Sequence, residues 1–429
     1  MPEFRIIFII VGVAGILAPV LAVIIGFIPA SARHFFDMAI TASAVIGIVV
    51  PLALATYYWR DSHELSAATP PMLLVMDGVG ADGVPNLALV FRTEQPTKNT
   101  LFYGAESLSE QIVESSATRE HVLMLKNLKS GTHYQWRLNS EATCSFATPS
   151  NDVLYHFGVG GDAHFGKGLA ASAGGDPNIM RSILKYVTEP RNQFNTFFIV
   201  GDMVNLGSPN EEWMKAMDTL APFTCGVPLR PVMGNHDAII NGAVHYLKYF
   251  YPEGMQTPRG TRLYYRIDSG RAHIIMLNLL WGVETFTAEQ RAWFIQQMES
   301  IPVDDWKIVM MHSMAYSSGN ISDGYAWYDP VEMVQQVAPL LEKYQVDLVI
   351  SGHNHHLEFL QRIGVSYAVV GTLGGALDPD AAYRSPASAW YRSGTHGFLD
   401  VTVRPESINL RFRDANANEL KAFAIGKNK

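Results

Sequence analysis

The first 59 residues contain two long apolar segments. Ile6–Pro29 has 24 residues and Met38–Trp59 has 22, and neither carries a charged side chain. A bilayer core of about 30 Å needs about 20 helical residues, so residues 1–59 predict a transmembrane hairpin linked by Ala30–Asp37. The alternatives are a cleaved signal peptide and a buried core helix. Because these runs exceed the roughly 7–15 apolar residues of a signal peptide, the pattern favours an uncleaved anchor.

A different pattern follows the apolar segments. Residues 60–71 are polar and end in Pro-Pro, which is typical of a linker. From 72 to 149, short runs rich in Val, Leu, Phe, Tyr and Thr alternate with turn residues, and they predict a small all-β sandwich. The seven expected strands lie within residues 72–79, 86–94, 99–105, 110–117, 120–128, 133–139 and 142–149. Leu128–Tyr134 resembles the tyrosine corner of fibronectin type III domains.

Residues 152–429 alternate strongly apolar strands with helical stretches. The expected helices include Pro177–Thr188, Glu211–Leu220, Ala288–Ser300 and Pro330–Tyr344. Such alternation predicts a layered α/β fold for this last and largest domain. We find no internal repeat and no low-complexity tract.

Composition restricts the possible functions. The chain is 48% hydrophobic and only 17% charged, with a net charge of −8, which argues against disorder and against a nucleic-acid-binding surface. The only two cysteines, Cys144 and Cys225, are too few for a small disulfide scaffold or a thiolate metal site. We expect Cys225 to be a small core residue.

Five predicted strands end directly in side chains that can bind metals. These are Asp162 with His164, then Asp202, Asn235, His312, and His353 with His355. In layered α/β folds the site lies beyond the carboxyl ends of the strands, so these groups can converge. Carboxylate, imidazole and amide donors suit Mn, Fe or Zn. Seven donors are too many for one tetrahedral ion and fit two divalent or trivalent ions about 3.5–4 Å apart.

The order of these motifs resembles the calcineurin-like metallophosphoesterase superfamily, whose motifs run D-x-H, G-D-x-x-D/N, G-N-H-D/E, H and G-H-x-H. The resemblance implies two metal ions with Asp202 as the bridging ligand and His236 as the general acid. It assigns one ion to Asp162, His164, Asp202 and His355, and the other to Asp202, Asn235, His312 and His353. The preceding β-sandwich looks like the N-terminal domain of purple acid phosphatases.

Four positions differ from the purple enzymes. Asn205 stands where they have a metal-binding tyrosine, and Ile321 and Ser322 stand where they have a histidine pair. The purple enzymes also lack a counterpart of His164. The resemblance therefore implies a non-purple relative, which does not inherit acid-phosphatase specificity.

Four more residues are expected near the site, as supports or substrate contacts. Asn205 and Asp237 belong to the second and third motifs, Tyr316 follows His312, and His356 extends the last motif. Plain surface exposure is the alternative for His356.

These observations predict a membrane-anchored binuclear phosphoesterase that hydrolyses phosphate esters with a metal-activated hydroxide. The expected partners are a phosphorylated substrate and a lipid bilayer. Arg5 and Arg60 flank one face of the hairpin and Arg33 the other, so charge does not set the membrane side. The resemblance to sandwich-bearing phosphatases implies a catalytic domain outside the cytoplasm. One alternative is a pyrophosphohydrolase acting on a lipid-linked head group. Another is a non-catalytic membrane-complex subunit that retains the fold, since Gly12, Gly15 and Gly26 offer close helix contacts for an oligomer or a complex.

Overall fold

The computed structural model describes residues 67–166, 174–252, 255, 259–322 and 324–427. The hairpin predicted at residues 1–59 lies outside these ranges. Among the residues that are described, no helix is both long and apolar enough to cross a membrane. The described residues form one compact unit, and all that follows concerns this unit.

An all-β region comes first, as the sequence predicted. Its seven strands are β1 (Thr69–Val79), β2 (Pro85–Thr97), β3 (Thr100–Gly104), β4 (Glu110–Val113), β5 (Thr118–Leu125), β6 (His133–Leu138) and β7 (Cys144–Ala147). Strands β4, β3, β6 and β7 form a four-stranded antiparallel sheet in that order. The predicted tyrosine corner is present, because the backbone N–H of Lys129 donates to the Tyr134 hydroxyl over 3.0 Å.

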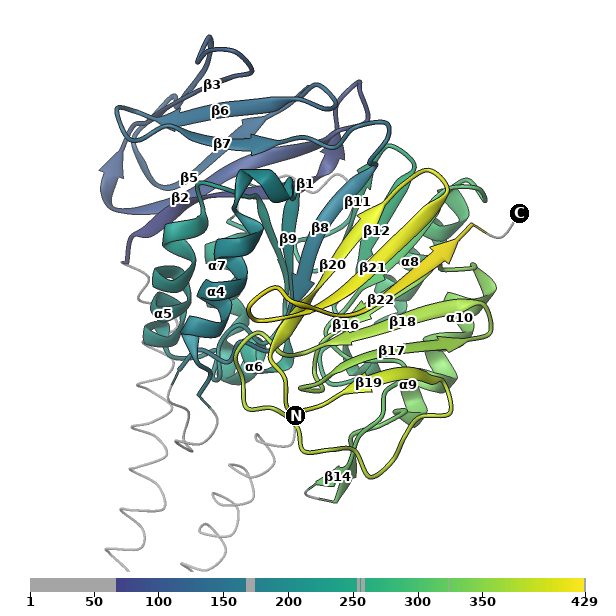
Figure 1. The fold of residues 1–429 in the computed structure, drawn as a ribbon. Coiled ribbons are helices and arrows are strands. Elements are labelled where there is room, and N and C mark those ends of the chain that lie inside the picture. Colours follow the sequence, from purple (N-terminus) through teal and green to yellow (C-terminus); the bar gives the residue numbers. More distant parts are fainter. Residues whose placement is uncertain (1–66, 167–173, 253–254, 256–258, 323, 428–429) are drawn as a thin grey trace, which may run out of the picture. The chain divides into compact units, whose positions relative to one another are not determined.

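The remaining strands of this region belong to a larger sheet. A nine-stranded sheet has the order β22-β21-β20-β8-β9-β10-β1-β2-β5, so it runs from the all-β region into the α/β domain (Figure 1). Its α/β strands are β8 (Tyr155–Gly160), β9 (Thr196–Val200), β10 (Leu229–Val232), β20 (Gly397–Val403), β21 (Ser407–Asp414) and β22 (Glu419–Gly426). The junction is parallel, with Leu74 of β1 opposite Leu229 of β10.

A seven-stranded sheet packs against the nine-stranded one. Its strands are β11 (Tyr265–Ser269), β12 (Ala272–Met276), β13 (Trp306–Met310), β16 (Leu348–Ser351), β18 (Val365–Val370), β17 (Leu357–Arg362) and β19 (Ser388–Arg392), in that order. Alternate residues separate its two faces. Ile274 and Ile308 join the core shared with β8 and β9, whereas Ile275 and Val309 join a second core under helices.

Helices cover the outer faces of both sheets and complete four layers (Figure 1). The nine-stranded sheet is covered by α4 (Pro177–Val187), α5 (Asn210–Leu220) and α7 (Ala243–Phe250), and the seven-stranded sheet by α8 (Ala288–Ser300), α9 (Val331–Gln336) and α10 (Ala338–Lys343). Shorter elements are α6 (Asn235–Ala238), the hairpin strands β14 (Ile321–Ser322) and β15 (Tyr325–Ala326), and the 3-10 turns 190–192, 221–223, 239–241 and 283–285.

One predicted helix is two helices. The stretch Pro330–Tyr344 divides into α9 and α10 around Val337. Pro339 has no N–H to donate and its ring clashes with the carbonyl four residues earlier, so a continuous helix is unfavourable there. Pro339 instead lies in the first turn of α10, where a missing N–H costs nothing.

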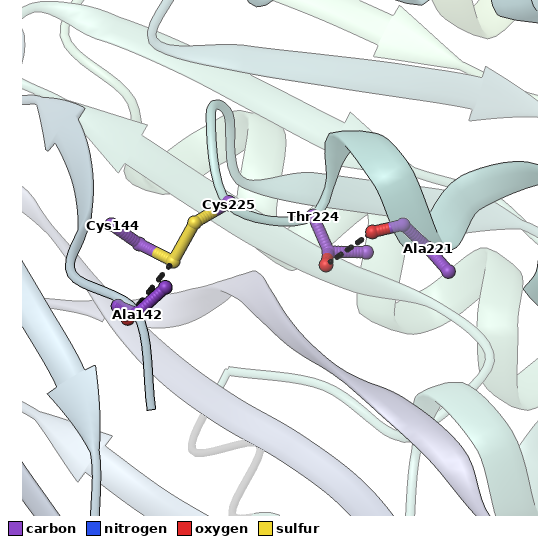
Figure 2. Close-up of a disulfide and its surroundings, with 5 residues drawn as sticks. All are labelled: Ala142, Cys144, Ala221, Thr224 and Cys225. Atoms are coloured by element: carbon purple, nitrogen blue, oxygen red, sulfur yellow. Dashed lines mark hydrogen bonds between the residues drawn. A yellow bond between two sulfur atoms is a disulfide. The ribbon is translucent and has the colours of Figure 1, made fainter. Parts of the chain in front are cut away.

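The expectation that Cys225 is a simple core residue is wrong. It forms a disulfide with Cys144, 81 residues earlier in the chain (Figure 2). Cys144 opens β7 in the all-β region, whereas Cys225 lies between α5 and β10, and the N–H of Ser145 also donates to the Cys225 carbonyl. Elements distant in sequence bring the two thiols together, and no local pattern around either cysteine indicates that approach.

Candidate metal centre

The predicted metal-binding residues come together at the carboxyl ends of adjacent strands. Asp162 and His164 follow β8, Asp202 follows β9, and Asn235 follows β10. From the facing sheet, His312 follows β13, and His353 and His355 follow β16. The two sheets therefore supply the two sides of one site.

Several of these residues have unusual backbone conformations. Asp162, His164, Asp202 and His353 have positive φ angles between 49° and 74°. Side chains other than glycine rarely adopt this region, and such strain is concentrated at functional sites. The turns are also too tight for extra atoms, since a Cβ at Gly234 would lie 2.1 Å from Asp202 Oδ1. The backbone thus turns sharply to aim the ligand side chains inward.

The first cluster consists of Asp162, His164 and His355. The Nε2 atoms of the two histidines lie 3.1 Å apart, and Asp162 Oδ1 lies 3.3 Å from Nε2 of His355 and 3.8 Å from Nε2 of His164. The other ring nitrogen of His355 donates to the Ala376 carbonyl over 2.5 Å. In the neutral ring this leaves Nε2 of His355 as a lone-pair donor for a metal.

The second cluster consists of Asn235, His312 and His353. Asn235 Oδ1 lies 2.8 Å from His312 Nε2 and 2.9 Å from His353 Nδ1, and these two nitrogens are 3.1 Å apart. His312 Nδ1 donates to the Val200 carbonyl over 2.8 Å. In the neutral His312 ring, the proton is therefore on Nδ1 and the lone pair is on Nε2. That lone pair faces the Asn235 Oδ1 atom with no proton between them.

Asp202 lies between the two clusters. Its Oδ2 is 3.6 Å from His164 Nε2 in the first cluster and 3.4 Å from His312 Nε2 in the second. Its Oδ1 accepts the backbone N–H of His236 over 2.8 Å. One carboxylate oxygen is consequently available to both sides, as a bridging ligand requires.

The electrostatics of the site favour added positive charge. Burial opposes protonation of His312 and His355, but the nearby Asp202 and Asp162 carboxylates raise their pKa values to about 10 and about 9. Burial and the neighbouring His312 charge lower the pKa of His353 to about 3. Burial alone would raise the pKa values of both aspartates, yet the surrounding imidazoles hold them below the usual range.

The donor set fits a pair of metal ions. Three groups of side chains have ligand atoms within 4.8 Å of one another: Asp162 with His164 and His355, His164 with Asp202 and His236, and Asp162 with Asp202 and His312. Close nitrogen and oxygen lone pairs repel each other unless a cation lies between them. Oxygen and imidazole donors without sulfur are those expected for Mn, Fe or Zn.

His236 lies beside His164 and Asp202 and is only partly buried. Its Nδ1–H donates to the backbone carbonyl of Asn205 over 2.7 Å, and its ring packs edge-on to His164 with centroids 4.6 Å apart. Because Nδ1 is used in this contact, Nε2 is the ring nitrogen that remains available on the side of the cleft. The contribution of Asn205 is thus its main-chain oxygen, rather than its side chain.

Asp237 is fully buried behind the site and contacts only backbone in this loop. Its Oδ1 accepts the N–H groups of Met203 and Val204, and its Oδ2 accepts that of Gly234. Burial and the nearby Asp202 charge raise its pKa to about 7. The side chain therefore holds the second and third motif loops together and positions Asp202.

The last two predicted residues lie outside the metal clusters. His356 is fully buried and contacts Asp378, Glu358 and Ser317, so it belongs to a polar network beneath the last motif. That network reaches the site because Asp378 accepts the N–H of His355 over 2.7 Å. Tyr316 is 5% exposed and packs against Tyr367 in the core under the seven-stranded sheet.

An open cleft of about 440 Å³ lies over the clusters. It is lined by His164, Asp202, Asn235, His236, His353 and His355, and also by Trp281 and Trp327, which the sequence interpretation did not identify. The ring centroids of Trp281 and Trp327 lie 5.8 and 5.3 Å from that of His353. Trp281 could have been found from its position in the chain. It follows β12, and the carboxyl end of β12 lies at the same sheet edge as that of β13.

Together these features define a metallohydrolase with a layered α/β catalytic domain and an N-terminal all-β region. Residues 155–357 match the family model described as calcineurin-like phosphoesterase. The matched residues form a calcineurin-like phosphoesterase domain, and the chain has purple acid phosphatases among its homologues, as its motifs predicted. Several of its homologues are named as acid phosphatases, which places the chain among hydrolases.

Several relatives support this assignment. Probable purple acid phosphatase 20 of Arabidopsis thaliana is 24% identical over 297 residues, which cover 64% of this chain and 66% of that protein. Purple acid phosphatase 18 of the same plant is 21% identical over 72% of this chain and 70% of its own length. The purple acid phosphatase from yellow lupin seeds has the same fold, with a TM-score of 0.68 over 84% of this chain and 74% of that chain, at 16% identity.

Proposed function

We propose that this protein hydrolyses phosphate esters at a pair of metal ions while anchored to a membrane. The observation that carries the catalytic proposal is the position of Asp202, whose Oδ2 lies within 3.6 Å of His164 in one cluster and 3.4 Å of His312 in the other. A carboxylate shared by two sets of donors is the hallmark of a binuclear hydrolytic site.

When bound, two such ions would activate water and neutralise charge on the phosphoryl oxygens. The chain's own residues would do the rest. Asp162, His164 and His355 would hold one ion, and Asn235, His312 and His353 the other, with Asp202 in contact with both. His236 would deliver a proton from Nε2 to the leaving oxygen, and the Asn205 carbonyl would hold the opposite ring nitrogen.

Two observations support membrane anchoring with the catalytic domain outside the cytoplasm. The apolar runs Ile6–Pro29 and Met38–Trp59 are each long enough to span a bilayer. The disulfide between Cys144 and Cys225 is typical of an oxidising compartment, because cytosolic thiols are kept reduced. Accessibility of a single engineered surface cysteine to an impermeant reagent in intact cells tests the membrane side.

The rival role of a non-catalytic subunit is less well supported. A protein that kept only the fold would be free to lose ligands, yet all seven predicted donors are present and converge on one site. Lipid-linked pyrophosphates stay on the list of substrates to test.

The decisive experiment is a substrate panel on purified full-length protein supplied with Mn, Fe or Zn. We expect hydrolysis of phosphomonoesters, read as phosphate release, or of phosphodiesters, read as alcohol release, and either activity should be abolished in Asp202→Ala and retained in Asp218→Ala. Asp218 is a matched control because it lies exposed on α5. Absence of hydrolysis across monoesters, diesters, nucleotides and lipid pyrophosphates by metal-loaded protein would refute the proposal.

A further inference from the structure

The cleft has an apolar wall next to the metal-binding side chains. Trp281 and Trp327 lie with ring centroids 6.2 Å apart, and both adjoin His353. Trp281 also lies 6.3 Å from His236, centroid to centroid. A leaving group protonated by His236 would therefore depart along indole surface rather than into a polar pocket.

Trp327 is held rigidly in this position. Its backbone N–H donates to the Asn320 carbonyl over 2.9 Å, and its carbonyl accepts from the Asn354 side chain over 2.8 Å. Its indole N–H donates to the Ser322 carbonyl over 3.3 Å. These bonds use the polar N–H at the edge of the indole ring and hold the ring in place. What remains for a ligand in the cleft is the apolar surface of the ring.

The apolar wall continues onto an exposed hairpin. Ile321 of β14 lines the cleft and is 69% exposed, and Tyr325 of β15 is 63% exposed. Figure 1 shows β14 projecting from the body of the α/β domain. Large apolar side chains grouped at the mouth of a site indicate a surface that is covered by an apolar ligand.

The charged side chains that line the cleft restrict how many phosphate groups a substrate can carry. Among the lining residues that the structure describes, none is lysine or arginine, and Asp378 contributes a carboxylate at the rim. Phosphates beyond the one at the metal-binding residues would meet no side-chain cation among these described residues, although such groups are normally held by Arg or Lys. This favours one phosphate over a diphosphate or a nucleoside polyphosphate.

We infer that the cleft accepts a phosphomonoester with a long apolar leaving group, that is, a lipid monophosphate whose chain lies along Trp281, Trp327 and Ile321. This inference rests on the proposed phosphoesterase function and names its substrate class. The reaction is hydrolysis: water adds to phosphorus, the bond between phosphorus and the lipid oxygen breaks, and that oxygen takes a proton from His236. The products are a lipid alcohol and inorganic phosphate.

A chain-length series tests the inference directly. Ethyl, butyl, hexyl and octyl phosphate release alcohols of nearly equal acidity, so differences between them report binding of the chain rather than bond breaking. Full burial of a methylene contributes about 0.8 kcal/mol, or about fourfold. In an open groove we expect about half that free energy, so kcat/KM should rise about twofold per methylene and roughly 60-fold from ethyl to octyl phosphate.

Two variants with the same substitution locate the effect. Ile321→Asp places a charge on the proposed path, whereas Ile363→Asp places it in the turn between β17 and β18 at nearly equal exposure, 69% against 68%. We expect the octyl-to-ethyl ratio of kcat/KM to fall at least tenfold in Ile321→Asp and to stay at the wild-type value in Ile363→Asp. An equal change in both variants, or in neither, overturns the inference.

Binding provides a readout without turnover. Calorimetric titration of the metal-loaded full-length protein in nanodiscs with ethyl and octyl phosphonate should give tighter binding and a more negative heat-capacity change for the longer chain. A flat chain-length profile in an active enzyme overturns the lipid assignment alone. Loss of all phosphoester hydrolysis overturns the proposed function, whereas a length-dependent phosphonate affinity still supports the apolar path.

Discussion

Replacement of His236 by alanine separates proton transfer from metal binding. The ring touches the rest of the protein mainly through the bond from Nδ1–H to the Asn205 carbonyl and through its edge-on contact with His164. The side chain is only partly buried, so its removal leaves a water-accessible space rather than a sealed cavity. We therefore expect His236→Ala to fold and to retain both metal ions.

The expected loss lies in the chemical step. A positioned general acid contributes roughly 10²–10⁴-fold, which is about 3–5 kcal/mol of activation free energy. The Asn205 carbonyl supports this role, since an acceptor at Nδ1 fixes the orientation of the ring. Asn205→Ala keeps that carbonyl and is the matched control, for which we expect little change in kcat.

The assay is a leaving-group series on wild type, His236→Ala and Asn205→Ala, with metal content measured on each preparation. The loss in His236→Ala should be largest for alkyl phosphates, whose alkoxides need a proton, and should shrink for nitrophenyl phosphate. A uniform loss across leaving groups would refute the role as an acid. Loss of metal from His236→Ala would instead make it a ligand, an arrangement compatible with its position near His164 and Asp202.

Four further predictions concern the metals and the stability of the fold. Elemental analysis should find two ions per wild-type chain and almost none in Asp202→Ala, because that carboxylate serves both clusters. Iron-loaded protein should lack a strong visible charge-transfer band, since Asn205 supplies no phenolate; a strong band would mean that a tyrosine reaches the metal. Cys144→Ser should lower the free energy of unfolding by about 2–5 kcal/mol, and an unchanged melting temperature in non-reducing calorimetry would contradict this. Protonated His312 and His355 stabilise the metal-free fold, because their pKa values are raised to about 10 and about 9 in the folded protein. This stabilisation is complete below about pH 6.5, the pKa of an unperturbed histidine, and should be lost as the pH rises through about 9 and 10. The melting temperature of the metal-free protein should fall over that range.

The sequence was most informative where chemistry and periodicity coincide. Each of the five motifs follows a short apolar run that forms a buried strand. Polar residues that follow such a run therefore lie at the end of the strand, at the edge of the sheet. The carboxyl ends of β8, β9 and β10 are aligned because these strands are parallel neighbours. The order of the motifs along the chain was therefore enough to predict that Asp162, Asp202 and Asn235 would meet.

Other features depend on contacts between distant segments, which a linear pattern does not report. Cys144 and Cys225 are brought together by the packing of the all-β region on the α/β domain. Trp281 and Trp327 come from separate loops, and only the fold places them side by side. Pro339 is different, because its effect on the helix is local and the sequence alone contained the signal.

The continuity of the nine-stranded sheet has a consequence for solubility. In the intact chain, β1 pairs with β10 on the side away from β9, so β10 has neighbours on both sides. A chain shortened to begin after residue 150 would remove β1, which lies opposite Leu229, and would leave β10 at a new edge of the sheet. Unprotected edges recruit strands from other molecules. The all-β region thus shields the catalytic sheet from association with copies of itself, whatever other role it has.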